Sequence, residues 1–150
     1  MATPLTLYVP IKQDAASQAA AKQVYDTFTT EAHTVLDQSK ILHYVRLALV
    51  PNAQGTEGYL ALLLITTFDG AMNPYLNYFW GQPAVKAVFV GITEVALYPP
   101  NPAVTDLTGF INFINANNLN QPQDLYQAYP QTVIQIAGAF PPTQAAAQPA

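Results

Sequence analysis

Two apolar runs joined by a short polar connection constrain the fold of this chain more than any other feature. The runs are Ile41–Val50 and Tyr59–Phe68, and the sequence PNAQGTEG between them contains two glycines. Both runs are rich in β-branched and aromatic residues, which favour strands, and the connection is typical of a turn. We therefore expect a β-hairpin whose apolar faces must be covered by the rest of the fold or by a partner.

The remaining periodicities predict one strand before the hairpin and a mostly helical region after it. Apolar residues recur at every second position in the first strand and at three- and four-residue steps in the helices. Residues 84–98 fit a helix by their spacing and a strand by their β-branching. Besides the hairpin, the expected elements are a strand over Leu5–Ile11, a long helix from Asp14 to about Ser39, a short helix capped by Asn73 and ending at Trp80, a helix capped by Thr105 and running from Leu107 to Ile114, a strand over Gln123–Tyr129, and a helix from Val133 to Phe140.

This order of elements predicts an α+β fold of the ferredoxin-like βαββαβ type, with an enlarged second helical crossover and a C-terminal helix. Its four-stranded antiparallel sheet would carry helices on one face only. We expect a single domain over residues 1–140. We interpret residues 141–150, PPTQAAAQPA, as a tail because they have neither periodicity nor charge.

Strand alternation assigns each side chain to one face of this sheet. We expect His43 among the aliphatic residues that face the helices, and Tyr8, Tyr44, Arg46 and Tyr59 on the opposite, open face. The aliphatic neighbours of these residues make the open face largely apolar, and an exposed apolar patch of that kind marks an interaction surface. The sequence therefore predicts a homodimer packed sheet to sheet, forming a barrel whose interior can hold a small ligand.

Composition excludes several other kinds of protein. Charged residues make up only 9% of the chain, the net charge is −4, and the five cations never cluster, so nucleic acid is not an expected partner. Without cysteine there is no disulfide, thiolate nucleophile or cysteine-ligated zinc. The sequence begins without the pattern of a signal peptide, and no apolar run reaches membrane-spanning length. We therefore expect a cytoplasmic protein without a membrane partner.

Three segments resemble bacterial proteins of the dimeric α+β barrel superfamily. They are HYVRLALVP at 43–51, LLLITTFDG at 62–70 and FINFINANNLNQPQDLYQAYP at 110–130. The closest likeness is to uncharacterised members, with a distant similarity to dye-decolourising peroxidases, chlorite dismutases and antibiotic-biosynthesis-type monooxygenases. Thr67 stands where the pattern before Phe-Asp-Gly would have asparagine. The resemblance implies a dimeric barrel and, as one function, oxidoreductase chemistry of the monooxygenase kind.

The histidines and glycines of this sequence do not fit a haem cofactor. In the haem-binding relatives the iron ligand is a histidine in the C-terminal part of the domain, and this chain has no histidine after His43. The Gly-x-x-Asp-Gly motif of the peroxidases would fall on residues 66–70, where Thr66 replaces its first glycine. No pair of histidines has metal-ligand spacing. We predict no metal site and no cofactor, and a haem peroxidase-like protein is the least favoured alternative.

The candidate ligand-binding residues are Arg46, Tyr8, Tyr44, Tyr59 and His43. Arg46, enclosed in an apolar barrel, requires an anionic partner: a ligand, or else Glu57, Asp69 or a carboxylate of the second copy. The tyrosines could stack on a planar ligand or simply pack at an interface. His43 could act as a base or be a hydrogen-bonded core residue, and Asp69 with Gly70 is expected to form the turn that ends the strand.

No catalytic set can be assembled from these residues, so two functions stay open. One is an enzyme, a monooxygenase-like oxidoreductase acting on a small anionic or aromatic substrate held by Arg46 and nearby tyrosines. The other is a non-catalytic homodimeric binding or interaction protein.

Overall fold

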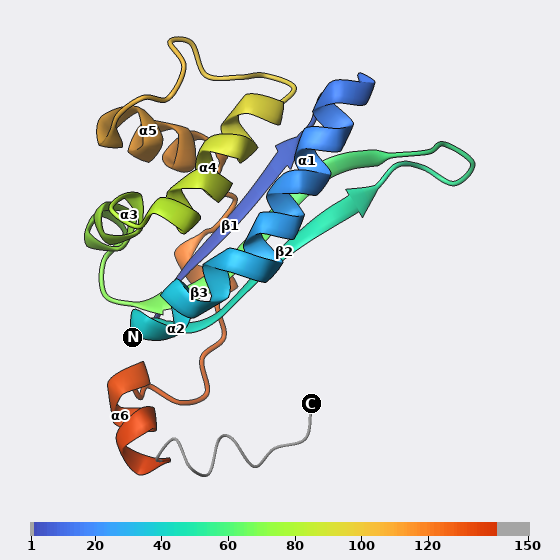
Figure 1. Ribbon diagram of the computed structural model, residues 1–150. Coiled ribbons are helices and arrows are strands. Elements are labelled where there is room, and N and C mark those ends of the chain that lie inside the picture. Colours follow the sequence, from blue (N-terminus) through green and yellow to red (C-terminus); the bar gives the residue numbers. More distant parts are fainter. Residues whose placement is uncertain (1, 141–150) are drawn as a thin grey trace.

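The computed structural model describes residues 2–140 and shows an α+β fold built on a three-stranded antiparallel sheet. Figure 1 shows helices gathered on one side of this sheet, with the last helix standing apart from the body. The elements are β1 (Ala2–Pro10), α1 (Ala15–Thr27), η1 (Phe28–Ala32), α2 (His33–Gln38), β2 (Leu42–Pro51), β3 (Tyr59–Asp69), α3 (Met72–Trp80), α4 (Pro83–Val95), α5 (Leu107–Asn117), η2 (Pro122–Asp124) and α6 (Val133–Ala139).

The strand order in the sheet is β1-β3-β2, so the second strand of the hairpin lies in the centre. The hairpin is confirmed, and the register pairs Leu7 with Leu64 and Leu64 with Leu47. These three side chains are buried and face the helices, as the alternation predicts.

The prediction of a fourth strand over Gln123–Tyr129 is wrong. That stretch forms the short 3₁₀ helix η2 followed by irregular chain. Two isolated bridges meet the free edge of β1 instead. Leu7 pairs with Asn118, where the Leu119 amide donates to the Thr6 carbonyl at 2.9 Å, and Ile11, just after β1, pairs with Ala96. The run of asparagines ends the pairing after one bridge, because asparagine side chains compete for the backbone groups that a ladder would use. The Asn118 side chain does so here, accepting from the Thr6 amide at 3.3 Å.

The first helical region spans the predicted length but is not a uniform α-helix. Asp14 caps it, its side chain accepting from the Ser17 amide at 2.9 Å, as predicted. The five-residue π segment η1 then interrupts it before α2 continues to Gln38. Phe28 and Ala32, at the two ends of η1, are both buried, so the wider turn keeps apolar residues directed at the sheet.

The helices after the hairpin resolve the ambiguity over residues 84–98. Most of that stretch is helix α4, where Val85, Val88 and Ile92 bury one face. Gly91 allows α4 to approach α1 closely, because a Cβ there would lie 2.5 Å from the Val24 side chain. Two expected caps were misplaced by one or two residues: α3 follows Ala71, which makes no side-chain cap, and α5 is capped by Asp106.

The chain after α5 crosses the sheet edge and leads to α6, which lies away from the body in Figure 1. Thr132 caps α6 through the Gln135 amide, confirming the expected terminal helix. Its apolar residues Ile134 and Ile136, and Phe140 after it, are exposed. The predicted tail at 141–150 lies outside the described residues. Within residues 2–140 no helix has the length and hydropathy needed to cross a membrane.

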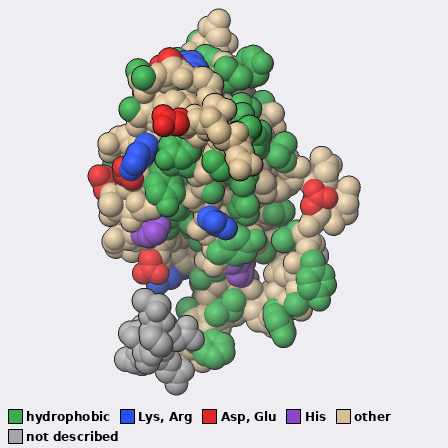
Figure 2. Space-filling view, turned by 90° about the vertical axis from the view of Figure 1, so that its right-hand side faces the viewer, with side chains coloured by type: hydrophobic (Ala, Val, Ile, Leu, Met, Phe, Trp, Pro, Cys, Tyr) green, Lys and Arg blue, Asp and Glu red, His purple; other side chains and the backbone are tan. Residues whose placement is uncertain are grey.

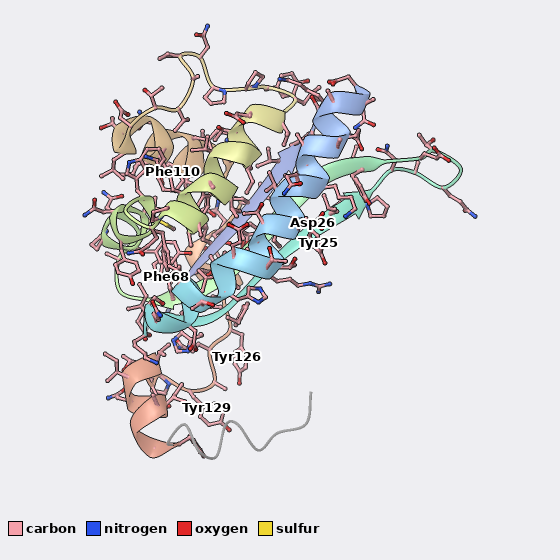
Figure 3. All side chains as sticks on the ribbon, in the orientation of Figure 1. Tyr25, Asp26, Phe68, Phe110, Tyr126 and Tyr129 are labelled. Atoms are coloured by element: carbon pink, nitrogen blue, oxygen red, sulfur yellow. The ribbon has the colours of Figure 1, made fainter. Side chains whose placement is uncertain are left out.

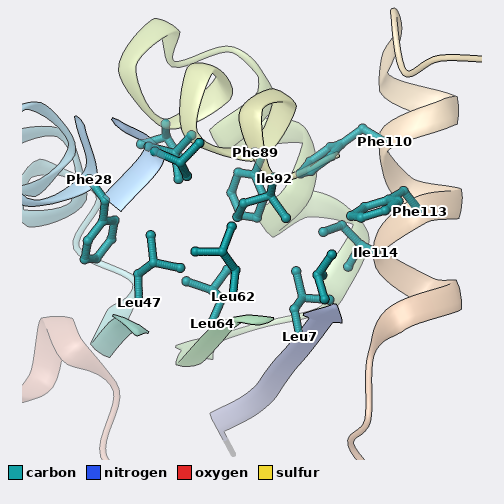
Figure 4. Close-up of a cluster of buried hydrophobic side chains, with 14 of the residues drawn as sticks. Leu7, Phe28, Leu47, Leu62, Leu64, Phe89, Ile92, Phe110, Phe113 and Ile114 are labelled. Carbon is teal, nitrogen blue, oxygen red and sulfur yellow. The ribbon is translucent and has the colours of Figure 1, made fainter. Parts of the chain in front are cut away.

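One hydrophobic core lies between the sheet and helices α1, α3, α4 and α5. Figure 4 shows its centre, where Leu62 and Leu64 of β3 meet Phe89 and Ile92 of α4, with Phe110 of α5 beside them. At the end of β3, Phe68 stacks on Tyr75 of α3 with ring centroids 3.7 Å apart. This stack joins the last turn of the hairpin to the helical layer.

The buried phenol of Tyr75 predicts a loss of stability at alkaline pH. Burial raises the pKa of Tyr75 from 10.0 to about 12. The pKa is higher in the folded state, so the neutral, buried phenol contributes to the free energy of unfolding. This contribution is complete below pH 10.0 and disappears as the pH rises to about 12. A shift of about two pKa units corresponds to about 3 kcal/mol. Urea unfolding between about pH 9 and 12 should show this loss in the wild type and not in Tyr75→Phe; parallel curves for the two proteins would contradict it.

Candidate binding site on the open face of the sheet

The face of the sheet that points away from the helices carries most of the predicted site residues. Tyr44 is 54% exposed and Arg46 is also exposed, whereas Tyr8, Leu63 and Ile65 are half-buried. We call the following nine side chains the open face. They form three rows across the sheet: Tyr8, Leu63 and Ala48; Thr6, Ile65 and Arg46; Pro4, Thr67 and Tyr44.

Arg46 lies in the middle row, beside Ile65. Among residues 2–140 the ion pairs are Lys22 with Asp26 and His43 with Asp69, so neither of the predicted partners within the chain, Glu57 and Asp69, pairs with Arg46. Figure 2, which views the right-hand side of Figure 1, shows few charged side chains among many hydrophobic and neutral ones. Among the nine side chains of the open face, the Arg46 guanidinium is the one charged group, and most of the others are apolar.

His43 does not lie where the sequence alternation placed it. A β-bulge between Leu42 and Tyr44 interrupts the register of β2, so that Leu42 pairs with the buried Phe68 while Tyr44 already pairs with Thr67. His43 is the extra residue, and a bulge reverses the alternation on one side of it. His43 therefore turns away from the helices, and its Nε2 contacts the Asp69 carboxylate at 2.8 Å.

Tyr59 does not lie on the open face, where the sequence predicted it. A second register shift, between Val50 and Pro51, turns the start of β3, and Tyr59 packs against the core on the helix side. Its backbone is fixed by Gln18 of α1, whose side chain accepts from the Tyr59 amide at 2.7 Å and donates to the Tyr59 carbonyl at 3.0 Å. Tyr59 is six residues along β3 from Ile65, or about 20 Å, so it cannot share a small ligand with Arg46.

Asp69 links three distant parts of the chain. One carboxylate oxygen contacts His43 of β2, and the other accepts from the Val133 amide at the start of α6 at 2.7 Å. The predicted turn at Gly70 is confirmed, with φ of 91°. The bond to Val133 was not predicted, and nothing in the local sequence around Asp69 indicates a contact 64 residues away.

Two adjoining pockets lie where residues 118–130, which we call the covering segment, pass over the start of β1. The larger pocket has a volume of about 650 Å³ and lies among Ala2, Pro4, Met72 and the covering segment. The smaller, of about 250 Å³, lies on the open face among Thr6, Tyr44, Ile65 and Thr67. Pro4, Asn120 and Leu125 line both.

Two polar groups in the smaller pocket were missed by the sequence reasoning. Thr67 Oγ1 and Asn120 Nδ2 are buried, and within residues 2–140 neither has a hydrogen-bond partner. Thr67 is only 6% exposed. The replacement of an expected asparagine by Thr67 and the asparagine-rich run before residue 121 were the only available signals, and neither predicts that the two side chains meet in one pocket.

Aromatic side chains of the covering segment extend from the rim of the larger pocket. Figure 3 shows Tyr126 and Tyr129 on the stretch that leads from the body to α6. They are 89% and 78% exposed, respectively. Tyr126 lines the larger pocket, so one edge of this ring faces the pocket while most of its surface stays open.

The structure contains no metal-ligand cluster within the part of the chain that it describes: no three side chains of His, Cys, Asp or Glu gather in one place there. Of the two ion pairs in the described part of the chain, His43–Asp69 is the one on this side of the sheet. Comparison of the chain with models of protein families, with curated proteins and with solved structures finds no match.

Proposed function

We propose that this chain is a small-molecule-binding protein that works as a homodimer, with the open faces of two copies packed against each other. The open face supports this proposal because it presents half-buried Tyr8, Leu63 and Ile65 around an exposed cation. The helices lie on the opposite side of the sheet (Figure 1), and the covering segment passes over the open face at the end that holds Pro4 and Thr67. A contiguous apolar surface of this kind on one chain marks an interaction site.

The strand order is compatible with a ferredoxin-like barrel half. In the sequence of strands β1-β3-β2, the bridge between Leu7 and Asn118 occupies the edge where a fourth strand of that fold would pair. Two such sheets packed face to face form the barrel of the dimeric α+β type. In this chain the edge is met at Leu7 by the covering segment and at Pro10 and Ile11 by the chain that follows α4, in place of a fourth strand.

Arg46 would have a definite role in such a dimer. Covering the open face removes water from its guanidinium, and a buried cation requires an anionic partner. A small anionic or aromatic ligand placed beside Tyr8 and Tyr44 provides one. A carboxylate of the second copy is the alternative, and it would make Arg46 an interface residue rather than a ligand-binding one.

Sedimentation equilibrium at micromolar concentration tests the dimer. We expect the wild type to sediment as a dimer and Ile65→Glu as a monomer, because the new carboxylate would be buried at the interface. Gln23→Glu is the matched control: it adds the same charge to an exposed position of α1 and should leave the dimer intact. A monomeric wild type would refute the proposal.

Fluorescence titration with anilinonaphthalene sulfonate, an aromatic anion, tests the role of Arg46. We expect saturable binding that Arg46→Met weakens about tenfold or more, as for the loss of one charged hydrogen bond. Lys40→Met removes an exposed cation elsewhere and should not change the affinity. Equal affinity of all three proteins would assign Arg46 to the interface alone.

The contact between His43 and Asp69 favours a second candidate function, a monooxygenase-like oxidoreductase. A carboxylate that orients an imidazole is an arrangement used by general bases, and the two side chains are 17% and 18% exposed. In this role His43 would take a proton from hydroquinone, a phenolic substrate, and the phenolate would give two electrons to oxygen, so that benzoquinone and hydrogen peroxide form. Oxygen consumption with hydroquinone that is present in the wild type and lost in His43→Gln would support this function. If the wild type consumes no oxygen, the oxidoreductase function is refuted and the binding function remains.

A further inference from the structure

We propose that the two adjoining pockets under the covering segment form one ligand site, and that its ligand is an uncharged carbonyl compound with an apolar body. This inference goes beyond the proposed function, because it assigns a second site with its own class of ligand. The site is separate from Arg46, which lines neither pocket. Its two walls are the β1–β3 end of the sheet and the covering segment.

The first observation is the state of Thr67. Thr67 is only 6% exposed, and its Oγ1 is buried and has no partner within residues 2–140. Other hydroxyls at this end of the sheet do find backbone acceptors: Thr66 Oγ1 donates to the Tyr44 carbonyl at 3.2 Å, and Thr3 Oγ1 donates to the Gly70 carbonyl at 2.6 Å. Buried polar groups are nearly always paired, so the exception at Thr67 calls for a partner from outside the chain.

The second observation is that Asn120 brings a matching donor from the other wall. Asn120 Nδ2 is buried without a partner in the described chain, and Asn120 and Thr67 both line the smaller pocket. The Asn120 backbone is held by its own contact, since its amide donates to Asn118 Oδ1 at 3.2 Å. A hydroxyl and an amide N–H that face one pocket together suit an oxygen acceptor placed between them.

The charge of the walls decides which kind of acceptor fits. Within residues 2–140, no Lys, Arg or His lines either pocket, and the one charged side chain is Asp124, a carboxylate on the smaller pocket. An anionic ligand would be repelled by Asp124 and would find no cation, whereas a neutral ketone, ester or amide oxygen can accept from both donors. The remaining walls include Met72, Leu125 and Tyr126 in the larger pocket, which suit the apolar body of such a ligand.

The first test asks whether Thr67 lacks a partner in the unliganded protein. Thr67→Val removes only the hydroxyl, so we expect its urea midpoint to equal or exceed that of the wild type. Thr66→Val is the matched control on the neighbouring position, and it should lower the midpoint because its hydroxyl does have an acceptor. A drop for Thr67→Val as large as that for Thr66→Val would overturn the inference, since the hydroxyl would then already be satisfied.

The second test uses the fluorescent naphthyl ketone Prodan, which is neutral and carries one carbonyl acceptor. We expect saturable binding to the wild type, weakened about fivefold by Thr67→Val and similarly by Asn120→Ala, as for one hydrogen bond each. Dimethylaminonaphthalene, which lacks the ketone, should bind with the same affinity to wild type and Thr67→Val. Absence of Prodan binding, or a Prodan affinity that neither substitution changes, would overturn the inference.

These outcomes are distinguishable from a failure of the proposed function. Anilinonaphthalene sulfonate binding that depends on Arg46, in a protein that does not bind Prodan, would leave the proposed function standing and refute the carbonyl site. Prodan binding that depends on Thr67, in a protein that sediments as a monomer, would support the carbonyl site and refute the dimer.

Discussion

Replacing Phe110 by alanine should lower the free energy of unfolding by about 3–5 kcal/mol, the range for removing a buried aromatic ring. Phe110 is fully buried, and its ring lies 4.9 Å from that of Phe89 and 5.1 Å from that of Trp80. In Figure 4 it stands between α4 and α5, so its loss opens a cavity that neither helix can fill. Urea unfolding followed by circular dichroism measures the difference.

Phe140→Ala provides the control for this substitution. It removes the same ring from a position that is 62% exposed, after α6, and should change the free energy of unfolding by less than about 0.5 kcal/mol in the monomer. A loss for Phe110→Ala no greater than that for Phe140→Ala would show that α5 does not pack on the core as described.

Asp69→Ala is expected to lower the free energy of unfolding by about 2–3 kcal/mol, because it removes one carboxylate that accepts from two partly buried donors. The Val133 amide would lose its acceptor, and the His43 imidazole would lose the group that fixes the bulge in β2. The change should also free α6. Hydrogen exchange resolved by residue should show faster exchange of the Val133 amide in this variant.

Asp69→Asn separates the charge of Asp69 from its geometry. The amide keeps one oxygen for the Val133 amide and gains an N–H that a neutral His43 Nε2 can accept. We therefore expect Asp69→Asn to retain most of the stability and the protection of Val133. If Asp69→Ala left the exchange of Val133 unchanged, the link between the hairpin and α6 would be disproved.

Local sequence patterns predicted most of the helices and strands because their causes are local. Asp14 caps the helix that follows it, and the spacing of Val85, Val88 and Ile92 buries one face of α4. The prediction of a strand at Gln123–Tyr129 was wrong because an alternating pattern shows only that a segment could form a strand. It does not show that a neighbouring strand has a free edge for it to pair with. In the structure, β1 offers that edge to Asn118 instead.

The candidate site could be predicted only in part. Arg46, Tyr44 and Tyr8 share the open face as expected, because the register of β1, β2 and β3 is regular between them. His43 and Tyr59 were misplaced because each lies beside a register shift, and a single extra residue reverses every assignment beyond it. Thr67 and Asn120 line one pocket because of where the chain returns after α5, which no short pattern encodes.

The position of the covering segment has a consequence for how this protein can change during evolution. Of the side chains that the structure describes, the last buried apolar one in chain order is Ile114, whereas one of the two walls of the larger pocket comes from residues 118–130. Substitutions that reshape the pocket therefore fall on positions that contribute little to the core. Chains that diverge from this one can acquire new ligand preferences through these residues while they keep the stability needed to fold.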